Sequence, residues 1–324
     1  MKRHPVVTAV AVAALAVVAP PSNAQSYPSK PVHYVVHSSP GDGPDLVTRL
    51  VGDRLANIWG QHVLVENRVG ASGTIAGAYV AKAQPDGYTL FTCNIAVNAI
   101  ASAMHAKLPY DGVRDFAPVS RIAMTSNVVV VNPSLPATTI AEFVAYARAN
   151  PGKLSYGSAG VGQSPHLTME LFKSLAGIDI VHIAYKGANP AVADLIGGQI
   201  PAMISNIPSV LAHAQSGKVR ALAVSGARRS PQLPSVPTLV ESGFPDVVVT
   251  SWYGMCAPAG TPTPILEKLH ADLMQVLAQP DVLRRFGELV VEAAPQSREE
   301  FAAFMRAEAT RWAQVVNDAK IPKQ

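Results

Sequence analysis

The fold of this chain is decided by two stretches, Ser38-Ser39-Pro40-Gly41-Asp42-Gly43-Pro44-Asp45 and Tyr156-Gly157-Ser158-Ala159-Gly160-Val161-Gly162-Gln163-Ser164-Pro165. The first follows the apolar run Val32–Val36 and the second follows Lys153-Leu154-Ser155, so each has the pattern of a strand, a loop of small residues and a helix start. Glycines let the backbone approach a ligand closely, and a helix start directs free N–H groups and a partial positive charge at the same point. The two stretches therefore predict two lobes that close on one ligand of the carboxylate type.

Strand and helix patterns alternate along nearly the whole chain, which predicts an α/β protein with parallel sheets covered by helices. The predicted strands are 32–36, 63–65, 88–92, 128–131, 180–184, 202–205, 221–225 and 247–251. The predicted helices are 45–59, 74–83, 139–150, 165–176, 189–196, 264–277 and 297–319. Thr139 with Glu142 and Ser297 with Glu300 have the spacing of capping boxes. Ser164 and Asn189, each followed by proline, have the pattern of N-caps.

A chain of 324 residues is long enough for two lobes, each with its own core. The best points for the chain to cross between them lie near 125–127 and 249–252. We predict a first lobe formed by 25–125 plus 249–324, and a second lobe, 126–248, inserted into it.

The first 24 residues have the pattern of a secretory signal peptide. Met1-Lys2-Arg3 is a charged start, 6–19 is an uncharged stretch rich in Val and Ala, and Ser22-Asn23-Ala24 places small residues at the positions that signal peptidase reads. We predict cleavage after Ala24 and a soluble, exported chain that begins at Gln25. A retained membrane anchor is the alternative, although the apolar stretch is short for a membrane span.

The charge balance argues against nucleic-acid binding, and the cysteine content allows at most one disulfide. Without Lys2 and Arg3 the chain holds 24 basic and 22 acidic residues, a balance too mild to indicate nucleic-acid binding. The two cysteines, Cys93 and Cys256, could form one disulfide in an oxidising compartment. The sequence does not place their Cα atoms within bridging range, and we expect two separate buried thiols.

Motifs of enzymes and cofactor sites are missing or wrongly spaced. Gly157, Gly160 and Gly162 form GxxGxG instead of the dinucleotide-binding GxGxxG. The chain has no GxSxG nucleophile motif and no HExxH zinc motif. Gly70-Ala71-Ser72-Gly73 is interpreted as a loop before a helix. The sequence thus predicts no catalytic residues, no cofactor and no metal.

Three polar side chains near the predicted cleft have two interpretations each. His37 ends the first strand, where it either donates a hydrogen bond to a ligand carboxylate or has a structural role. His166 lies in the first turn of a helix that faces the cleft, where it either reaches the ligand or caps the backbone. Lys186 either pairs with a ligand carboxylate or remains solvated.

A series of short motifs runs in order along the mature chain. It consists of Tyr27-Pro28-Ser29-Lys30-Pro31, Pro40-Gly41 with Asp45, Val65-Glu66-Asn67-Arg68, Ala83-Gln84-Pro85-Asp86-Gly87-Tyr88-Thr89-Leu90, Leu108-Pro109-Tyr110-Asp111, Tyr156-Gly157-Ser158-Ala159-Gly160, Tyr185-Lys186-Gly187, Gly197-Gly198-Gln199 and Ala257-Pro258-Ala259-Gly260-Thr261-Pro262. Over essentially the whole mature chain, this series resembles the solute receptors of tripartite tricarboxylate transporters, also called Bug-type periplasmic binding proteins.

The resemblance implies a two-lobed periplasmic binding protein (Venus flytrap, type II) with mostly parallel sheets flanked by helices. It implies a monomer that captures a small carboxylated solute in the periplasm and passes it to membrane subunits of the transporter. The pincer loops would be 38–44 and 158–164, with further residues lining the same cleft. The ligand-binding residues carried over by motif and position are Ser38, Ser39, Gly41, Asp42, Gly43, Cys93, Asn94, Ser158, Ala159, Gly160, Ser164, His166, Tyr185, Lys186, Gly187 and Asn206.

Three departures from the family pattern bear on the ligand. The family usually has an aromatic residue where Ser38 stands, a glycine where Asp42 stands, and often an aspartate where Ser205 stands. A missing aromatic wall and a missing aspartate favour a bulkier organic acid, aromatic carboxylates included, over an amino acid. The Asp42 carboxylate would repel an anionic ligand, so we expect its side chain to turn to solvent or to cap its own helix.

Two other functions remain open on the sequence. An exported sensor with the same fold would hand the signal of the same kind of solute to a membrane histidine kinase. An exported hydrolase would require a base paired with a nucleophile, and no such pair is visible.

Overall fold

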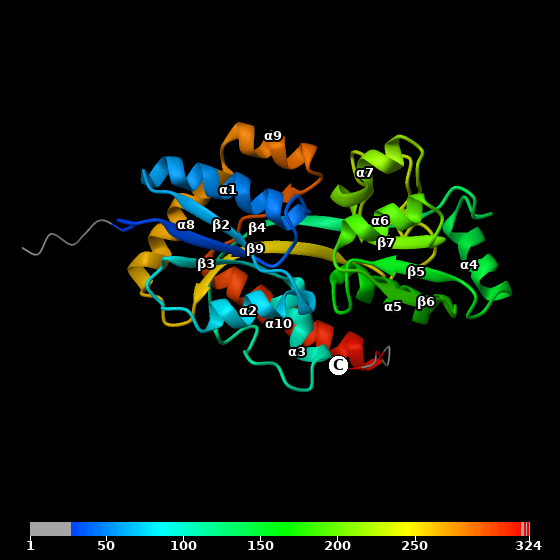
Figure 1. Ribbon diagram of the computed structural model, residues 1–324, viewed down its shortest axis with the longest axis horizontal. Coiled ribbons are helices and arrows are strands. Elements are labelled where there is room, and N and C mark those ends of the chain that lie inside the picture. The colour runs from blue at the N-terminus through cyan, green and yellow to red at the C-terminus, as the bar shows by residue number, and fades with distance from the viewer. Residues whose placement is uncertain (1–26, 319–320, 322, 324) are drawn as a thin grey trace, which may run out of the picture.

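Two lobes lie side by side and are connected by strands that pass from one into the other (Figure 1). The structure, a computed structural model, describes residues 27–318, 321 and 323, so the predicted signal peptide and its cleavage after Ala24 lie outside the described residues. Strands β4 (Phe116–Val131) and β9 (Thr250–Pro258) run antiparallel to each other through the junction. Within the described part of the chain, no helix has the length and apolar character needed to cross a membrane.

The first lobe holds the chain up to the first part of β4 and the chain from β9 onward. Its strands are β1 (Val32–Val36), β2 (Val63–Asn67), β3 (Thr89–Asn94) and β10 (Glu292–Ala293). Its helices are α1 (Gly43–Trp59), α2 (Thr74–Ala81), α3 (Ala101–Met104), α8 (Thr263–Leu277), α9 (Pro280–Glu288) and α10 (Arg298–Asp318), with a short 3₁₀ turn at Ala71–Gly73 and a π-helical run at Ala96–Ile100.

The second lobe holds the chain between the end of β4 and β9. Its strands are β5 (Ser155–Ser158), β6 (Val181–Ala184), β7 (Ala202–Asn206) and β8 (Arg220–Val224). Its helices are α4 (Ile140–Ala149), α5 (Ser164–Ala176), α6 (Ala188–Ile196) and α7 (Ile207–Gln215).

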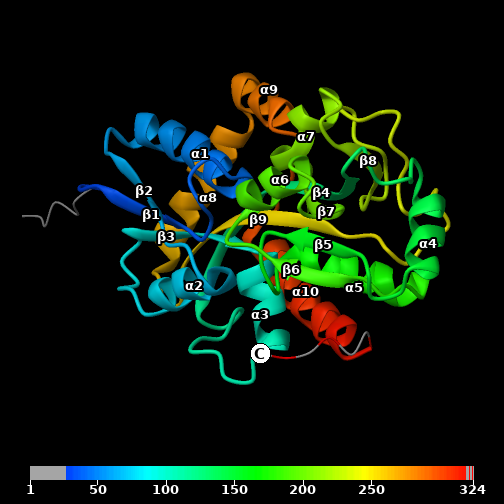
Figure 2. The ribbon, with the colours of Figure 1, turned by 45° about the vertical axis from the view of Figure 1, so that its right-hand side comes forward.

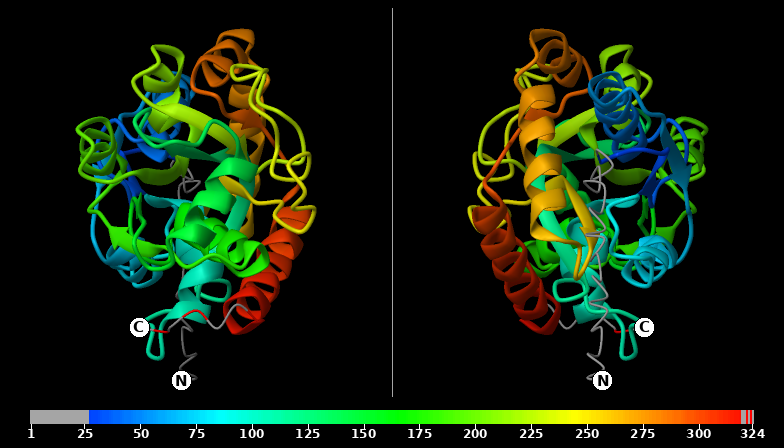
Figure 3. Two further views of the ribbon diagram at one scale, coloured as in Figure 1. Left: turned by 90° about the vertical axis from the view of Figure 1, so that its right-hand side faces the viewer. Right: turned by 90° about the vertical axis from the view of Figure 1, so that its left-hand side faces the viewer.

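Each lobe has a mixed sheet in which most strands run parallel and a minority run antiparallel to them. In the first lobe, β1 pairs in parallel with β2 and β3, and β9 joins β3 in antiparallel orientation. In the second lobe, β5 pairs in parallel with β6 and β7, whereas β4 lies antiparallel between β7 and β8. The predicted α/β fold is confirmed: it is a two-lobed binding-protein fold whose sheets have helices on both faces, as the end-on views show (Figure 3).

Strand β4 belongs to both sheets. Its residues from Phe116 to Ser126 pair with β9, and those from Asn127 to Val131 pair with β7. Sequence patterns predicted only the last four residues of this strand, because its first half alternates apolar residues with Ser and Arg, and pairing with β9 fixes its conformation. The lobe limits, 25–125 with 249–324 and 126–248, stay a prediction.

Local signals identified some helix starts correctly and others wrongly. Both predicted capping boxes form, with Thr139 and Glu142 at α4 and Ser297 and Glu300 at α10. Ser164 and Asn189 are not N-caps, because α5 is preceded by Gln163 and α6 by Gly187. The run from Ala96 to Met104 was not predicted as helical, because Asn94, at the end of a strand, accepts its first N–H groups.

The longest helix, α10, runs along the underside of the first lobe and packs against α3 and the π-helical run (Figure 2). Its buried face presents Phe301, Met305 and Trp312 to the same core cluster as Trp252 of β9. The indole N–H groups of Trp252 and Trp312 both donate to the Glu308 carboxylate, at 3.1 and 3.3 Å. These contacts anchor β9 where it enters the junction between the lobes.

The expectation of two separate thiols is wrong, because Cys93 and Cys256 form a disulfide. Cys93 lies on β3 and Cys256 on the adjacent β9, which brings their Cα atoms to 5.8 Å across a sequence separation of 163. The sequence alone could not show that these two strands are neighbours. Both side chains are fully buried in the core of the first lobe.

Removing this disulfide is expected to destabilise the protein by about 2–4 kcal/mol, because the cross-link restricts the unfolded chain over a long loop. The double variant Cys93→Ala with Cys256→Ala, compared with the oxidised protein by urea unfolding, measures the effect. Equal midpoints for the variant and the oxidised protein would show that the bond contributes nothing to stability.

Candidate functional site

A cleft of about 570 Å³ lies between the lobes. Segments at the carboxyl ends of five strands line it, which is where ligands bind in α/β sheets. Four of them are the loops after β1, β2, β5 and β6, and the fifth is the junction between β7 and α7. The lining residues that the argument uses are His37, Ser38, Ser39, Asp42, Ser72, Gly160, Val161, Lys186, Gly187 and Asn206. Residues from both predicted pincer loops therefore meet at one site.

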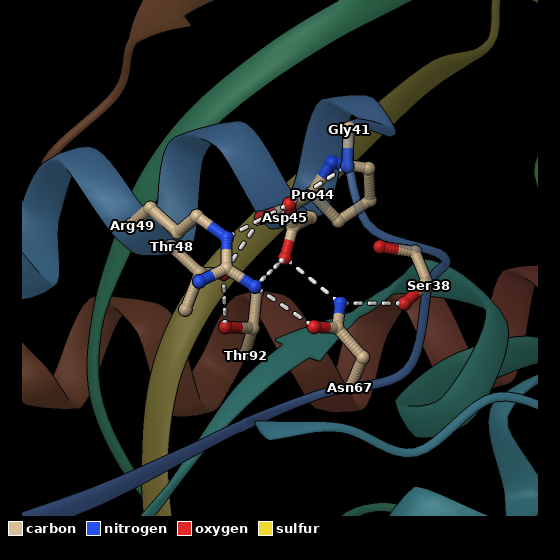
Figure 4. Close-up of polar contacts among 8 residues, drawn as sticks. All are labelled: Ser38, Gly41, Pro44, Asp45, Thr48, Arg49, Asn67 and Thr92. Carbon is tan, nitrogen blue, oxygen red and sulfur yellow. Dashed lines mark hydrogen bonds and ion pairs between the residues drawn. The ribbon is translucent and has the colours of Figure 1, made fainter. Parts of the chain in front are cut away.

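A buried carboxylate holds the first pincer loop in place (Figure 4). Asp45, in the first turn of α1, is 1% exposed and accepts the Gly41 N–H at 2.8 Å and the Arg49 Nε–H at 3.0 Å. The Asn67 side-chain amide donates to Asp45 at 2.8 Å and to the Ser38 carbonyl oxygen at 2.9 Å. Asp45 and Asn67 thereby fix both ends of the loop that carries Ser39 and Asp42.

The charge state of Asp45 follows from these contacts. Burial opposes ionisation, but hydrogen bonds from Arg49, Gly41 and Asn67 hold the pKa of the Asp45 carboxyl below its usual range. Asp45 is therefore ionised at neutral pH and serves as a structural anchor behind the cleft.

A second anchor for α1 lies one turn further along the helix. The Thr48 hydroxyl donates to the Pro44 carbonyl oxygen at 2.6 Å and lies 2.7 Å from the Thr92 hydroxyl on β3. The start of α1 is thus tied to the sheet as well as to its own loop.

The second pincer loop rests on a stack of three rings. Tyr156 stacks on His182 and His182 on His166, with centroid distances of 4.8 and 4.1 Å. Ser158 lies on the same face of β5 as Tyr156, and its hydroxyl is 2.7 Å from His182 Nε2. Burial lowers the pKa of His166 to about 4 and, together with the neighbouring His166, that of His182 to about 3. Both rings are therefore neutral in ordinary buffers.

Two of the side chains with open interpretations now have defined partners. His166 Nδ1 accepts the Gly162 N–H at 3.1 Å, so it supports the loop backbone. The Asn94 amide donates to His37 Nδ1 at 3.1 Å, because the Asn94 oxygen already accepts two backbone N–H groups. This contact leaves the proton of the neutral His37 ring on Nε2, and burial lowers the pKa of His37 to about 4. His37 lines the cleft.

The loop Ala71–Gly73 is a third wall of the cleft that the sequence interpretation missed. Ala71 and Ser72 have φ of 45° and 53°, values that are uncommon outside glycine and that cluster at functional sites. The Ser72 hydroxyl donates to the Val161 carbonyl oxygen and so connects the two lobes across the cleft. The position of this loop could have indicated it. Gly70 and Gly73 follow β2, and β2 is the parallel neighbour of β1, so the loops after the two strands lie at the same edge of the sheet.

Replacing Ser72 with alanine is expected to weaken solute binding about 2- to 10-fold, because one hydrogen bond that favours closure is lost. Titration calorimetry measures the affinity, and small-angle scattering measures the compactness of the unliganded protein. Ser174→Ala, at an exposed position of α5, is the control. An unchanged affinity in Ser72→Ala would mean that this bond does not bias the lobes toward closure.

The third predicted segment, Tyr185-Lys186-Gly187, also lines the cleft. The Tyr185 hydroxyl donates to Asp194 at 2.8 Å, which ties the segment to α6. Gly187 has φ of 112°, and a Cβ atom built on it would lie 3.4 Å from the Ser39 hydroxyl oxygen in the first lobe. The second lobe therefore lies close to the first pincer loop at Gly187.

Asn206 links the cleft to the strands that join the lobes. Its amide donates to the Asn127 side-chain oxygen on β4 and to the Ser251 hydroxyl on β9, each at 2.7 Å. The Asn127 amide in turn donates to Ser164 and Thr168 of α5. Ser164 is therefore part of a polar network at the junction and does not face the cleft.

The structure separates the predicted site residues into two groups. Those that line the cleft are Ser38, Ser39, Asp42, Gly43, Ala159, Gly160, Tyr185, Lys186, Gly187 and Asn206. Cys93, Asn94, Ser158, Ser164 and His166 are buried behind it, and Gly41 is exposed outside it. The second group supports the loops through the disulfide and hydrogen bonds described above, and ligand contact by the first group stays a prediction.

Asp42 does not cap its own helix, which was one of the two expected orientations of its side chain. It occupies the N-cap position of α1, but its side chain makes no capping hydrogen bond. Instead, its partly buried carboxyl lines the cleft.

Comparisons with known proteins agree with this architecture. Residues 47–321 match the family described as tripartite tricarboxylate transporter family receptor. Protein BugT from Bordetella pertussis is 35% identical over 306 residues, which cover 94% of this chain and 94% of BugT.

Two solved structures are similar to this chain in both sequence and fold. The R. palustris protein Rpa4515, solved with adipate, is 35% identical to this chain with a TM-score of 0.88. The match covers 92% of this chain and 100% of the Rpa4515 chain. MatC from Rhodopseudomonas palustris, solved with bound malate, is 32% identical to this chain with a TM-score of 0.85. The match covers 90% of this chain and 100% of the MatC chain. The chain belongs to the tripartite tricarboxylate transporter receptor family, a family of solute receptors and not of enzymes.

Proposed function

We propose that this protein is a periplasmic receptor that captures a small carboxylated solute between its lobes and delivers it to a membrane transporter of the tripartite tricarboxylate type. The observation that carries the proposal is the cleft of about 570 Å³, lined by two helix starts from opposite lobes. This volume lies within the usual range for small-molecule sites, about 300–1,000 Å³.

The groups that face the cleft suit a carboxylate. The N-terminal ends of α1 and α5 contribute partial positive charge and unpaired backbone N–H groups. The Ser38 hydroxyl has no hydrogen-bond partner among the described residues although its oxygen is buried. His37 presents a neutral ring with a proton on Nε2, and Lys186 supplies an ammonium group from the second lobe. We infer that these donors, directly or through water, hold the solute carboxylates.

The relatives support the class of solute. Adipate and malate, the compounds in the two related structures, are both dicarboxylates. Ser38 is small and leaves room for a bulkier acid, so the class we propose is di- and tricarboxylates together with aromatic acids. Export by a signal peptide cleaved after Ala24, and a monomeric state, complete the proposal.

A thermal-shift screen of the mature chain, Gln25–Gln324, tests the proposal. A ligand that binds only the folded state raises the melting temperature, and 100 times its Kd stabilises by about 2.7 kcal/mol. The panel holds adipate, malate, citrate, aromatic acids and amino acids. The expected result is a shift with one carboxylate series and recovery of the compound unchanged. A shift with amino acids alone, or chemical conversion of the compound, would contradict the proposal.

A further inference from the structure

Asp42 is an acidic side chain placed where the solute is proposed to bind. Its carboxyl lines the cleft, makes no capping hydrogen bond and forms no ion pair within the part of the chain that the structure describes. The backbone N–H of Ser39 is the contact that favours its charged form. Asp45, three residues later, has hydrogen-bond partners that Asp42 lacks, because Gly41, Arg49 and Asn67 all donate to it.

Asp42 points across the cleft toward the second lobe. A Cβ atom built on Gly187 would lie 3.8 Å from an Asp42 carboxylate oxygen. A solute held between these two loops would therefore lie next to the Asp42 carboxyl. Two carboxylates that share a partly buried site cannot both ionise readily, because each charge disfavours the other.

We propose that Asp42 takes up one proton when the carboxylated solute binds, so that its carboxyl becomes a hydrogen-bond donor to the solute instead of a repelling charge. The proton comes from the surrounding water or buffer, adds to one Asp42 oxygen and returns to solvent when the solute leaves. This inference rests on the proposed function. A hydrogen bond from a carboxylic acid to a carboxylate is of the short, charge-assisted kind.

The chemistry around Asp42 supports a proton as the neutralising group. Burial, opposed by the Ser39 N–H and aided by the negative charge of Asp45 on the same helix, raises the pKa of Asp42 to about 6. A solute carboxylate alongside would raise the pKa again. Near neutral pH, most protein molecules would then gain a proton at Asp42 when the solute binds.

His37 and Tyr253, two titratable groups near Asp42, do not change charge between pH 6.5 and 8.5. Burial lowers the pKa of His37, at the end of β1, to about 4, so its ring stays neutral. Tyr253 of β9 lies behind Gly43, and burial together with the charge of Asp42 raises its pKa, so its phenol stays neutral as well. Lys186 faces the cleft from the second lobe without an ion pair to Asp42, and it remains available to a solute carboxylate.

The test is titration calorimetry with adipate and L-malate at pH 6.5, 7.5 and 8.5, in two buffers that differ in ionisation enthalpy. The difference between buffers gives the number of protons taken up. For the wild-type protein we expect uptake approaching one proton and an affinity that falls about tenfold for each pH unit above the pKa of Asp42. In Asp42→Asn, we expect no proton uptake, no pH dependence, and tighter binding than wild type at pH 8.5.

Asp53→Asn is the matched control, since it removes the same charge from an exposed position of the same helix. It should behave as wild type in every titration. At high pH, Asp42→Asn could also bind the solute where the wild type does not bind at all. That result would support the proposal as well, because it too assigns the repulsion of the solute carboxylate to the ionised Asp42 side chain.

Three results would overturn the proposal. Wild-type binding without proton uptake would do so, and so would weaker binding by Asp42→Asn at every pH, which would show that the ionised Asp42 contacts a donor on the solute. A ¹³C NMR titration of the solute complex follows the Asp42 carboxyl directly, and a carboxyl that stays ionised in the complex at pH 7 would also overturn it. Failure of wild type and Asp42→Asn alike to bind any carboxylate of the screen would instead count against the proposed function on which this inference rests.

Discussion

Replacing Ser39 with tryptophan is expected to weaken solute binding by roughly 100-fold or more while the protein remains folded. Ser39 lines the cleft, its side chain makes no hydrogen bond within the described residues, and its hydroxyl oxygen faces Gly187 of the second lobe. An indole at this position would fill the space where the lobes meet and prevent closure. Because overpacking costs on the order of 1–3 kcal/mol at a closely fitted contact, and lost solute contacts add to it, two orders of magnitude in Kd is the expected scale.

Titration calorimetry with the solute identified by the screen measures this effect. Ser174→Trp is the control, because Ser174 is exposed on α5 and outside the cleft. Far-UV circular dichroism and the melting temperature without solute should match between the two variants. If Ser39→Trp binds as tightly as Ser174→Trp, the solute does not occupy the space between Ser39 and Gly187.

Replacing Asp45 with alanine is expected to lower the free energy of unfolding by about 2–3 kcal/mol and to weaken binding as well. The change leaves the Gly41 N–H, the Arg49 guanidinium and the Asn67 amide without their shared acceptor. The first pincer loop then loses the contact that fixes its position relative to α1. Urea unfolding measures stability, and Asp53→Ala, on the exposed side of the same helix, is the control. Equal midpoints for the two variants would contradict the anchoring role.

The stability effect of Asp45 also predicts a pH dependence. The pKa of Asp45 is lower in the folded protein than its ordinary value of about 4. A depressed folded-state pKa stabilises the protein above the unfolded-state pKa, and this contribution disappears as the pH falls toward the folded-state pKa. The difference in stability between wild type and Asp45→Ala should therefore be largest near neutral pH and should shrink below about pH 4.

The parts of the site that sequence reasoning predicted are those encoded by local signals. Small residues and prolines after a strand marked both pincer loops, and the pairs Thr139 with Glu142 and Ser297 with Glu300 marked two helix starts. Ser39 and Gly160 could be placed at the cleft because helix starts next to the carboxyl ends of strands have a known geometry.

The remaining features depend on contacts that are distant in sequence. Cys93 and Cys256 pair because β3 and β9 are neighbours in the sheet. Ser158 turns away from the cleft because strand alternation places it on the face of His182 and α5. The wall at Ser72 forms because β2 lies next to β1, so that the loop after β2 reaches the second lobe. None of these follows from the residues flanking each position.

The central claim is that a carboxylated solute binds between the two pincer loops, and a crystal structure of the mature protein with that solute tests it most directly. The account predicts density for the solute inside the cleft, with one carboxylate within hydrogen-bond distance of the loop that carries Ser38 and Ser39, and with Gly160 and Lys186 closing on the solute from the other lobe. Solute density at any other place on the protein, with only water in this cleft, would contradict it.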